Sequence, residues 1–367
     1  MRPFFFKLCY LGSMQLVVLV ALAAVFIVYC SPKGNTMAVE KKSNQNIEVN
    51  DSEHSQPFNN DQYFGACLEP APGRILHGAQ AEVPVSIFSR YVDWEGLDNY
   101  TRMSGHRPKI IMHYITFDPL GYRLLKDTII DISRQDINYI PQIGLDFYSY
   151  LPTLSILHPR DVTQKIAEGA YDERIRDLAR LFIKMDRPIF LRPGYEFGGK
   201  GQGRHASKKY WVDAWKRIYR IFKTEGAQHI AFVWHTLDAV DYMEYYPGDE
   251  YVDWWAVSVF DNNADQSEFL NAFIKDAARH RKPVMIAEST PRYIGSIGGR
   301  QSWEKWYQPL FDLVFTYPHI KALCYINASW ANYPDKTFQY DARIQSDSYV
   351  SKRFGSILSD KRFIHND

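Results

Sequence analysis

Two glutamates stand directly after strongly apolar segments of the sequence. Glu196 follows the stretch RPIFLRPGY, and Glu288 follows the stretch RKPVMIA. Rigid apolar strands can hold two carboxylates on either side of a bond between two sugars. Hydrolysis of such a bond needs this pair, because one carboxyl group protonates the leaving oxygen and the other attacks or directs water. The pair indicates glycoside hydrolysis, although a lone Glu after a strand is more often a turn residue or a helix cap.

Other polar side chains also stand where apolar segments end. His235 closes the stretch HIAFVWH, and three aspartates occupy comparable places: Asp118, Asp146 and Asp261. His235 either contacts a sugar or simply satisfies a strand end. Each aspartate is explained equally well by a structural role. A polar group at the end of one apolar strand after another is nevertheless more than a hydrophobic core requires.

Eight short β-rich runs carry these residues. They lie on average about 35 residues apart and begin near Arg74, Lys109, Asn138, Pro188, His229, Val252, Pro283 and Lys321. Amphipathic helical stripes lie between them, over residues 175–185, 211–222 (with Ser207 as cap), 269–277 and 303–314. Continuous apolar strands alternating with helices predict an α/β fold, a single-domain (β/α)8 TIM barrel whose chemistry sits at the C-terminal ends of the strands. The first strand lacks the Gly-rich turn of an open nucleotide-binding sheet.

The composition fits a large globular domain. The chain has 367 residues, of which 46% are hydrophobic, 15% aromatic and 23% charged, with a formal net charge of +1. Such a chain can bury a large core, which excludes a mostly disordered protein. The near-zero net charge gives no support for a polyanion-binding surface, so we expect no nucleic-acid partner. The aromatic side chains either fill the core or stack on the apolar faces of sugars.

The first 30 residues differ from the rest of the chain. Two basic residues precede an apolar run over Leu16–Tyr29, which is followed by Cys30. This pattern predicts export to an extracellular or periplasmic location. Cleavage as a signal peptide, lipidation at Cys30 and retention as a membrane anchor all stay open. Residues 31–62 are polar and lack apolar periodicity, so we expect a flexible tether to a catalytic domain over residues 63–367.

The sequence offers little for a metal or a cofactor. No CxxC or Cys/His cluster points to zinc, and Cys67 and Cys324 either form a disulfide or stay buried thiols. The segment GGKGQG (198–203) lacks the spacing of a phosphate-binding loop and is interpreted as a loop beside Glu196. GSIGG (295–299) is the remaining candidate for a phosphate grip. We therefore expect no metal, no cofactor and a monomer.

Three segments together resemble glycoside hydrolase family 26. They are RPIFLRPGYEFGG (187–199), YYPGDEYVDWWAVSVFDNN (245–263) and KPVMIAEST (282–290), in order and at suitable spacing. The resemblance extends over residues 74–335 and implies a (β/α)8 fold with a retaining mechanism. Members of this family are mostly secreted β-mannanases, with some β-1,3-xylanases and mixed-linkage β-glucanases.

The resemblance implies roles for four residues. Glu196 matches the general acid/base, and Glu288 matches the nucleophile. Arg192 matches an arginine that orients the catalytic carboxylates, and Trp330 resembles a tryptophan that lies under the reacting sugar.

Two positions depart from the mannanase pattern. Tyr195 stands where His usually precedes the acid/base, and Phe260 stands where a Tyr often donates a hydrogen bond to the nucleophile. A Tyr donates a hydrogen bond but does not change its charge near neutral pH. A Phe deprives Glu288 of a donor that would favour its ionised form.

We predict an enzyme, a retaining glycoside hydrolase of a β-linked polysaccharide, with β-1,4-mannan as the first substrate to consider. Its substrate-binding residues are expected to be Arg192, Tyr195, His235 and Trp330. β-Glucanase and β-1,3-xylanase activities are the alternatives within the family. A non-catalytic carbohydrate-binding protein on a degenerate hydrolase barrel is the alternative from another class; the two departures favour it and the presence of both glutamates opposes it.

Overall fold

The computed structural model describes residues 63–64, 67–81, 93–117, 138–149, 160–198, 207–261, 263–331 and 335–366. The predicted export segment and tether, with Cys30, lie outside the described residues. So do Asp118 and residues 199–203 of the GGKGQG segment. Within the described ranges, no helix has the length and apolar character needed to cross a membrane.

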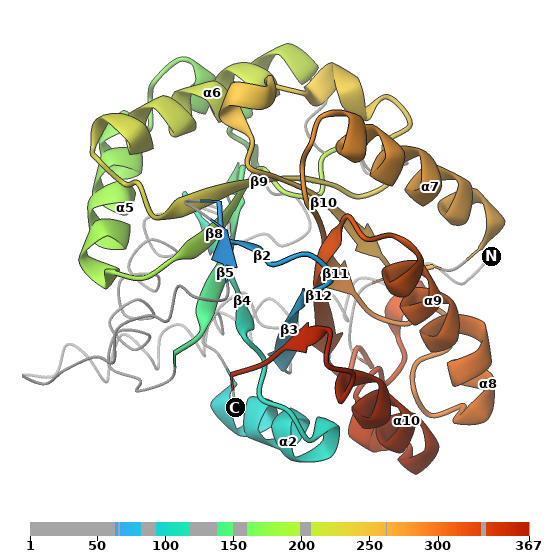
Figure 1. The fold of residues 1–367 in the computed structure, drawn as a ribbon. Helices are drawn as coiled ribbons and strands as arrows, with labels where there is room; N and C mark the ends of the chain where they lie inside the picture. The colour runs from blue at the N-terminus through green and yellow to red at the C-terminus, as the bar shows by residue number, and fades with distance from the viewer. Residues whose placement is uncertain are drawn as a thin grey trace, which may run out of the picture. The chain divides into compact units, whose positions relative to one another are not determined.

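Eight parallel strands of the described chain close into a barrel (Figure 1). They are β3 (Ile75–Ala81), β4 (Ile110–Thr116), β5 (Ile140–Asp146), β8 (Ile189–Pro193), β9 (Ile230–Thr236), β10 (Trp254–Val259), β11 (Val284–Ser289) and β12 (Ile320–Asn327). Each pairs with its neighbours in chain order, and β12 pairs with β3 to close the ring. Every one of the eight predicted runs is a strand, and the predicted TIM barrel is confirmed.

Helices surround the barrel in Figure 1. They are α2 (Trp94–Ser104), α4 (Thr163–Ala167), α5 (Asp172–Met185), α6 (Lys208–Thr224), α7 (Ala264–Arg279), α8 (Arg300–Ser302), α9 (Gln308–Thr316) and α10 (Ser348–Leu358). A π-helical segment, η4 (Trp303–Tyr307), joins α8 to α9. The predicted cap of α6 is confirmed, because the Ser207 hydroxyl accepts a hydrogen bond from the Tyr210 amide at 3.4 Å.

The strands contribute side chains to two apolar layers, because successive side chains of a strand point to opposite faces. One layer fills the barrel and includes Phe190, Trp254 and Met285. The other lies between strands and helices and includes Trp211 and Trp215 of α6. Tight packing on both faces fixes the strand backbones, and with them the side chains at the strand ends.

Cys324 lies in the inner layer and carries a free thiol. Burial raises the pKa of this thiol to about 12. Of the two alternatives left by the sequence, the structure therefore holds no disulfide between Cys324 and Cys67.

Short segments cover the N-terminal end of the barrel. β1 (Tyr63–Phe64) pairs with β2 (Glu69–Pro70), which crosses the barrel in Figure 1. The indole of Trp254 donates a hydrogen bond to the Cys67 carbonyl between them. β13 (Phe363–Ile364) pairs with the beginning of β3. The opposite end of the barrel carries the residues predicted to do chemistry.

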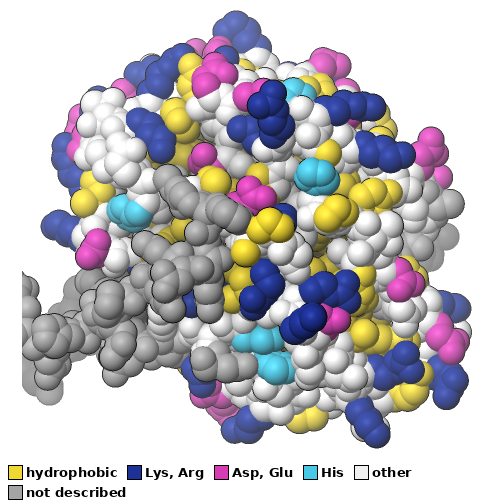
Figure 2. Space-filling view, in the orientation of Figure 1, with side chains coloured by type: hydrophobic (Ala, Val, Ile, Leu, Met, Phe, Trp, Pro, Cys, Tyr) yellow, Lys and Arg dark blue, Asp and Glu magenta, His cyan; other side chains and the backbone are white. Residues whose placement is uncertain are grey.

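The remaining elements lie in the connections: β6 (Tyr148–Ser149), β7 (Arg160–Asp161), and the 3-10 turns η2 (Tyr242–Tyr245), η3 (Asp249–Tyr251), η5 (Lys336–Phe338) and η6 (Ile344–Ser346). Figure 2 shows acidic and basic side chains interspersed over one face of the molecule, as a net charge of +1 suggests.

Candidate active site

Glu196 stands on a tight turn directly after β8. Gly194 and Glu196 both have left-handed backbone, with φ of 53° and 56°. A side chain at Gly194 would meet the Trp211 indole nitrogen at 2.6 Å, so only glycine fits this close approach. The chain is anchored again where the Phe197 amide donates to the His235 carbonyl at 3.3 Å. The packed surroundings thus hold Glu196 in a backbone conformation that is uncommon for its residue type.

Glu288 lies inside the end of β11, where only 6% of it is exposed. Its Oε1 accepts a hydrogen bond from Nη1 of Arg192 at 2.7 Å, and Arg192 is fully buried. Burial opposes the charge of the guanidinium, but Glu288 beside it more than compensates, so the pKa of Arg192 is raised. The pair can keep a buried carboxylate ionised, as a nucleophile requires.

Ser258 lies between the two glutamates, and the sequence analysis did not single it out. A shift in strand register between Val257 and Ser258 places Ser258 opposite Glu288 on β11. The Ser258 hydroxyl donates a hydrogen bond to Oε1 of Glu196 at 2.7 Å. Both carboxylates therefore flank one small residue at the end of β10. Nothing in the stretch AVSVF marks this serine except its place two residues before Phe260.

His235, predicted as a substrate-binding residue, is fully buried at the end of β9. Its Nδ1 lies 3.0 Å from Nη1 of Arg192, and its Nε2 lies 3.0 Å from the Ser258 hydroxyl. These two contacts of the imidazole are thus with the residues that bind the two glutamates.

Two neighbouring tyrosine rings lie near the Arg192 guanidinium, with their centroids 5.5 Å apart. The guanidinium carbon lies 5.1 Å from the ring centroid of Tyr195 and 5.4 Å from that of Tyr114. Burial, followed by the charge of Glu288, raises the pKa of Tyr114 well above its ordinary value. Tyr114, on β4, is a second residue that the sequence analysis missed. Tyr195, predicted to bind substrate, precedes Glu196 in the chain, and its ring lies near Arg192.

Trp330 follows β12 and is 9% exposed. Its indole nitrogen donates a hydrogen bond to the hydroxyl of Thr290 at 3.3 Å. Thr290 follows Glu288 by two residues in the chain. Its ring lies 5.6 Å from that of Phe338, which also contacts Phe260 at 5.2 Å. Trp330 is thus fixed on the Glu288 side of the barrel end, with Phe260 in an apolar cluster beside it.

The other strand-end aspartates make local contacts. Asp146 accepts a hydrogen bond from the Tyr148 amide at 3.1 Å, as in a turn. Asp261 lies 3.6 Å from Arg292, and burial raises the pKa of its carboxyl group. In the loop GSIGG, Ser296 is buried and bonds the Tyr307 hydroxyl at 2.6 Å. Across the described part of the chain, no group of three or more His, Cys, Asp or Glu side chains is arranged to hold a metal ion.

Comparison with known proteins agrees with this geometry. The sequence pattern of Glycosyl hydrolase family 26 matches residues 164–308, a span that includes both glutamates. Beta-1,3-xylanase TXYA of Vibrio sp is 25% identical over 339 residues, which are 83% of this chain and 71% of that protein. A beta-1,3-xylanase of Alcaligenes sp is 25% identical over 234 residues, 55% of this chain and 49% of that protein.

A solved GH26 beta-mannanase from Bacteroides ovatus has the same fold. It superposes with a TM-score of 0.58 and 16% identity, over 80% of this chain and 90% of that chain. The fold, the matched family pattern and the two strand-end glutamates agree with one another. Residues 164–308 thus carry the pattern of glycosyl hydrolase family 26, within a barrel of the same fold as a solved GH26 enzyme.

Proposed function

We propose that the protein cleaves a β-linked polysaccharide by double displacement, with retention of the anomeric configuration. The observation that carries this proposal is the buried contact of 2.7 Å between Arg192 and Glu288, opposite a second carboxylate held by Ser258. A guanidinium favours an ionised Glu288, and an ionised carboxylate is the form that attacks.

In the first step Glu288 attacks the anomeric carbon, the glycosidic bond breaks, and Glu196 gives its proton to the departing oxygen. In the second step Glu196 takes a proton from water, the water oxygen attacks the same carbon, and Glu288 leaves. Both glutamates return to their starting states, and no oxidant, reductant or cofactor is needed.

For the substrate we propose β-1,3-xylan first. Two relatives that align with this chain are named beta-1,3-xylanases, and one aligns with 83% of it. Tyr195 and Phe260 also depart from the mannanase pattern at positions next to the two glutamates. β-1,4-Mannan, the substrate expected from the sequence, is the second candidate because mannanases dominate the resemblance described above. The likeness to the solved mannanase, at 16% identity, supports the fold rather than the sugar.

The test is reducing-sugar release from β-1,3-xylan, β-mannan, glucomannan, mixed-linkage glucan and cellulose. Release from one substrate, abolished in both Glu196→Gln and Glu288→Ala, supports the proposal. Glu304→Gln is the matched control, because this glutamate lies on η4, its side chain is 63% exposed and its ion-pair partner is Arg300. Proton NMR of the first product distinguishes retention from inversion. Near-normal turnover in either active-site variant would remove the assignment.

Sugar binding without turnover by the folded wild-type protein would favour the non-catalytic alternative. Export of the domain, predicted from residues 1–30, is also proposed. Fractionation of the producing cells tests export, and recovery of the protein only in the cytoplasm would contradict it.

A further inference from the structure

We infer that Arg192, His235 and Ser258 form a hydrogen-bond chain of fixed direction that ends on Glu196, so that His235 and Ser258 are positioning residues for the proton-transferring carboxylate. The chain links the two glutamates through three contacts of 3.0, 3.0 and 2.7 Å, beginning at the arginine that binds Glu288. The direction of the chain rests on geometry alone; its catalytic consequence rests on the proposed function.

The direction follows from which groups can donate. A guanidinium has donors and no acceptor, so Nδ1 of His235 must accept the hydrogen bond from Arg192. A histidine whose Nδ1 accepts is neutral and carries its proton on Nε2, which then donates to the Ser258 hydroxyl oxygen. The single hydroxyl proton of Ser258 is left to point at Oε1 of Glu196.

The surroundings keep His235 neutral. The ring is fully buried, and a second positive charge would stand 3.0 Å from the Arg192 guanidinium. The charged and titratable groups that the described residues bring near this chain include Arg192, Glu288, Glu196, Tyr114, Tyr195 and, on β12, the buried thiol of Cys324. Glu288 is already bonded to Arg192, and both tyrosines are neutral near neutral pH.

The chain gives Glu196 two unequal oxygens. Ser258 donates to Oε1, so the proton that the leaving oxygen receives is assigned to Oε2. A hydroxyl donor also favours the ionised carboxylate, which is the form required as base in the second step. The three residues of the chain neither gain nor lose a proton in the reaction. They orient the carboxyl group and set the pH range over which it stays protonated.

The first test reads the histidine directly and needs no activity. In the full chain labelled with 15N-histidine, the His235 resonances, assigned with His235→Gln, should show a protonated Nε2 and a bare Nδ1 from about pH 5 to about pH 8. A protonated Nδ1 or an imidazolium in this range would overturn the inference. This result stands whether or not a substrate is found, so its failure is distinct from failure of the proposed function.

The second test uses kinetics on the substrate that the panel identifies. Ser258→Ala should move the alkaline limb of the kcat/KM profile up by about one pH unit, because the ionised Glu196 loses a donor. It should also lower kcat about tenfold on aryl glycosides, whose good leaving groups make the base-assisted second step limiting. Ser258→Thr restores the hydroxyl and should recover both.

His235 has an informative pair of replacements. Gln can accept from Arg192 with its oxygen and donate to Ser258 with its nitrogen, whereas Leu can do neither. His235→Leu keeps the Ser258 hydroxyl but not its orientation, so it should shift the alkaline limb in the same direction as Ser258→Ala and by less, and His235→Gln should recover most of that shift. An unshifted profile in Ser258→Ala, or equal profiles for His235→Gln and His235→Leu, would overturn the inference.

Discussion

At the residue scale, the site depends on a buried charge that is paired with one carboxylate. Arg192 has no exposed surface, and Glu288 is its ion-pair partner at 2.7 Å. The neighbouring rings of Tyr114 and Tyr195 accommodate a planar cation better than a compact ammonium group. The residue is therefore expected to be irreplaceable in shape as well as in charge.

Arg192→Met should lower kcat/KM at least about 100-fold, because Glu288 loses the group that orients it and favours its ionised form. An unpaired buried carboxylate should also cost about 3 kcal/mol in the free energy of unfolding. Arg192→Lys keeps the positive charge but loses the planar guanidinium with its several donors. Compared with Arg192→Met, it should recover more of the stability than of the activity. Near-normal kcat/KM in Arg192→Met would contradict the assignment. Steady-state kinetics measures kcat/KM, and urea unfolding measures the free energy of unfolding.

Gly194 is the residue on which the position of Glu196 depends. Its φ is 53°, and a Cβ would meet Trp211 at 2.6 Å and Phe147 at 2.7 Å. Gly194→Ala should therefore cost about 3 kcal/mol, from backbone strain and overpacking together. It should also lower kcat, since the turn must shift the glutamate two residues further on.

Gly226→Ala is the matched control for Gly194→Ala. Gly226 also has a positive φ, 88°, but a Cβ there meets nothing within 4 Å. This variant should cost about 1 kcal/mol from strain alone and leave kcat unchanged. If the two variants lose the same stability and both keep full activity, the close approach at Gly194 does not position the site.

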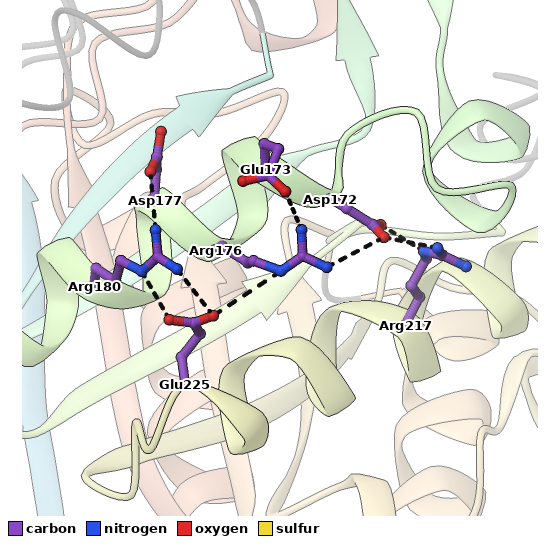
Figure 3. A network of polar contacts seen from close by, with 7 residues as sticks. All are labelled: Asp172, Glu173, Arg176, Asp177, Arg180, Arg217 and Glu225. Atoms are coloured by element: carbon purple, nitrogen blue, oxygen red, sulfur yellow. Dashed lines mark hydrogen bonds and ion pairs between the residues drawn. The ribbon is translucent and has the colours of Figure 1, made fainter.

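At the element scale, α5 and α6 flank β8, which carries Arg192 and leads into the Glu196 turn. Figure 3 shows the ion pairs between these helices. Arg217 of α6 binds Asp172 at the start of α5 with contacts of 2.6 and 2.7 Å. Glu225, directly after α6, forms an ion pair with Arg180 of α5, whose Nε lies 2.8 Å from the Glu225 Oε2. The network ties together the two helices on either side of the strand that holds the site.

Asp172→Asn should destabilise the protein by about 1 kcal/mol near neutral pH, because a partly exposed pair is screened by solvent. The hydrogen bond from Arg217 lowers the pKa of Asp172 below its ordinary value of 3.8. Its contribution is therefore complete above the unfolded-state pKa and is lost as pH falls through the folded-state value. Urea unfolding should show the difference between wild type and variant near neutral pH and its loss in strong acid.

Asp177→Asn is the control for Asp172→Asn. Asp177 is 54% exposed and lies 3.8 Å from Arg180, so its removal should change stability little. An equal loss in both variants, or a loss in Asp172→Asn that persists in strong acid, would show that the α5–α6 pair is not its source.

The elements themselves were largely predictable, and their fine positions were not. The eight apolar runs became the eight barrel strands because a strand buried on both faces must be apolar throughout. Ser258 could not be singled out, since its role depends on a register shift in β10 and on a partner 62 residues away in the chain. His235 was predicted as a site residue, but its burial and its two partners required the assembled barrel.

Several short elements also escaped the sequence analysis. β2 and β13 are two residues long, which is too short for a periodic pattern. α7 begins after Asn263, whose side chain accepts from the Gln266 amide at 2.9 Å, before the apolar stripe at residues 269–277 starts. Capping depends on which backbone amides lack a partner, and this is settled only when the helix is packed.

At the scale of the whole molecule, two neighbouring barrel strands each bury a histidine away from the site. His77 of β3 contacts Tyr100 at 2.7 Å and His365, beyond β13, at 2.9 Å. Burial, with His365 and His106 nearby, lowers the pKa of His77 well below its ordinary value. Burial and Arg187 lower the pKa of His113 on β4 to about 3. Within the described residues, neither ring nitrogen of His113 has a hydrogen-bond partner.

These histidines should make the barrel sensitive to mild acid. The unfolded chain binds protons near pH 6.5, whereas the folded chain excludes them, so stability is complete above that pH and falls below it. By linkage, each histidine should lower the free energy of unfolding by about 1.4 kcal/mol for every pH unit below this point.

His113→Leu should remove the contribution of His113 to this dependence of stability on pH between about pH 6.5 and about pH 5. It should keep or raise stability near neutral pH, because an unpaired buried polar group is lost. His319→Gln is the control, because His319 is exposed, and it should keep the wild-type dependence of stability on pH. Urea unfolding at several pH values across this range measures the dependence of stability on pH. If His113→Leu shows the same dependence as the wild type, the ring is protonated inside the folded barrel.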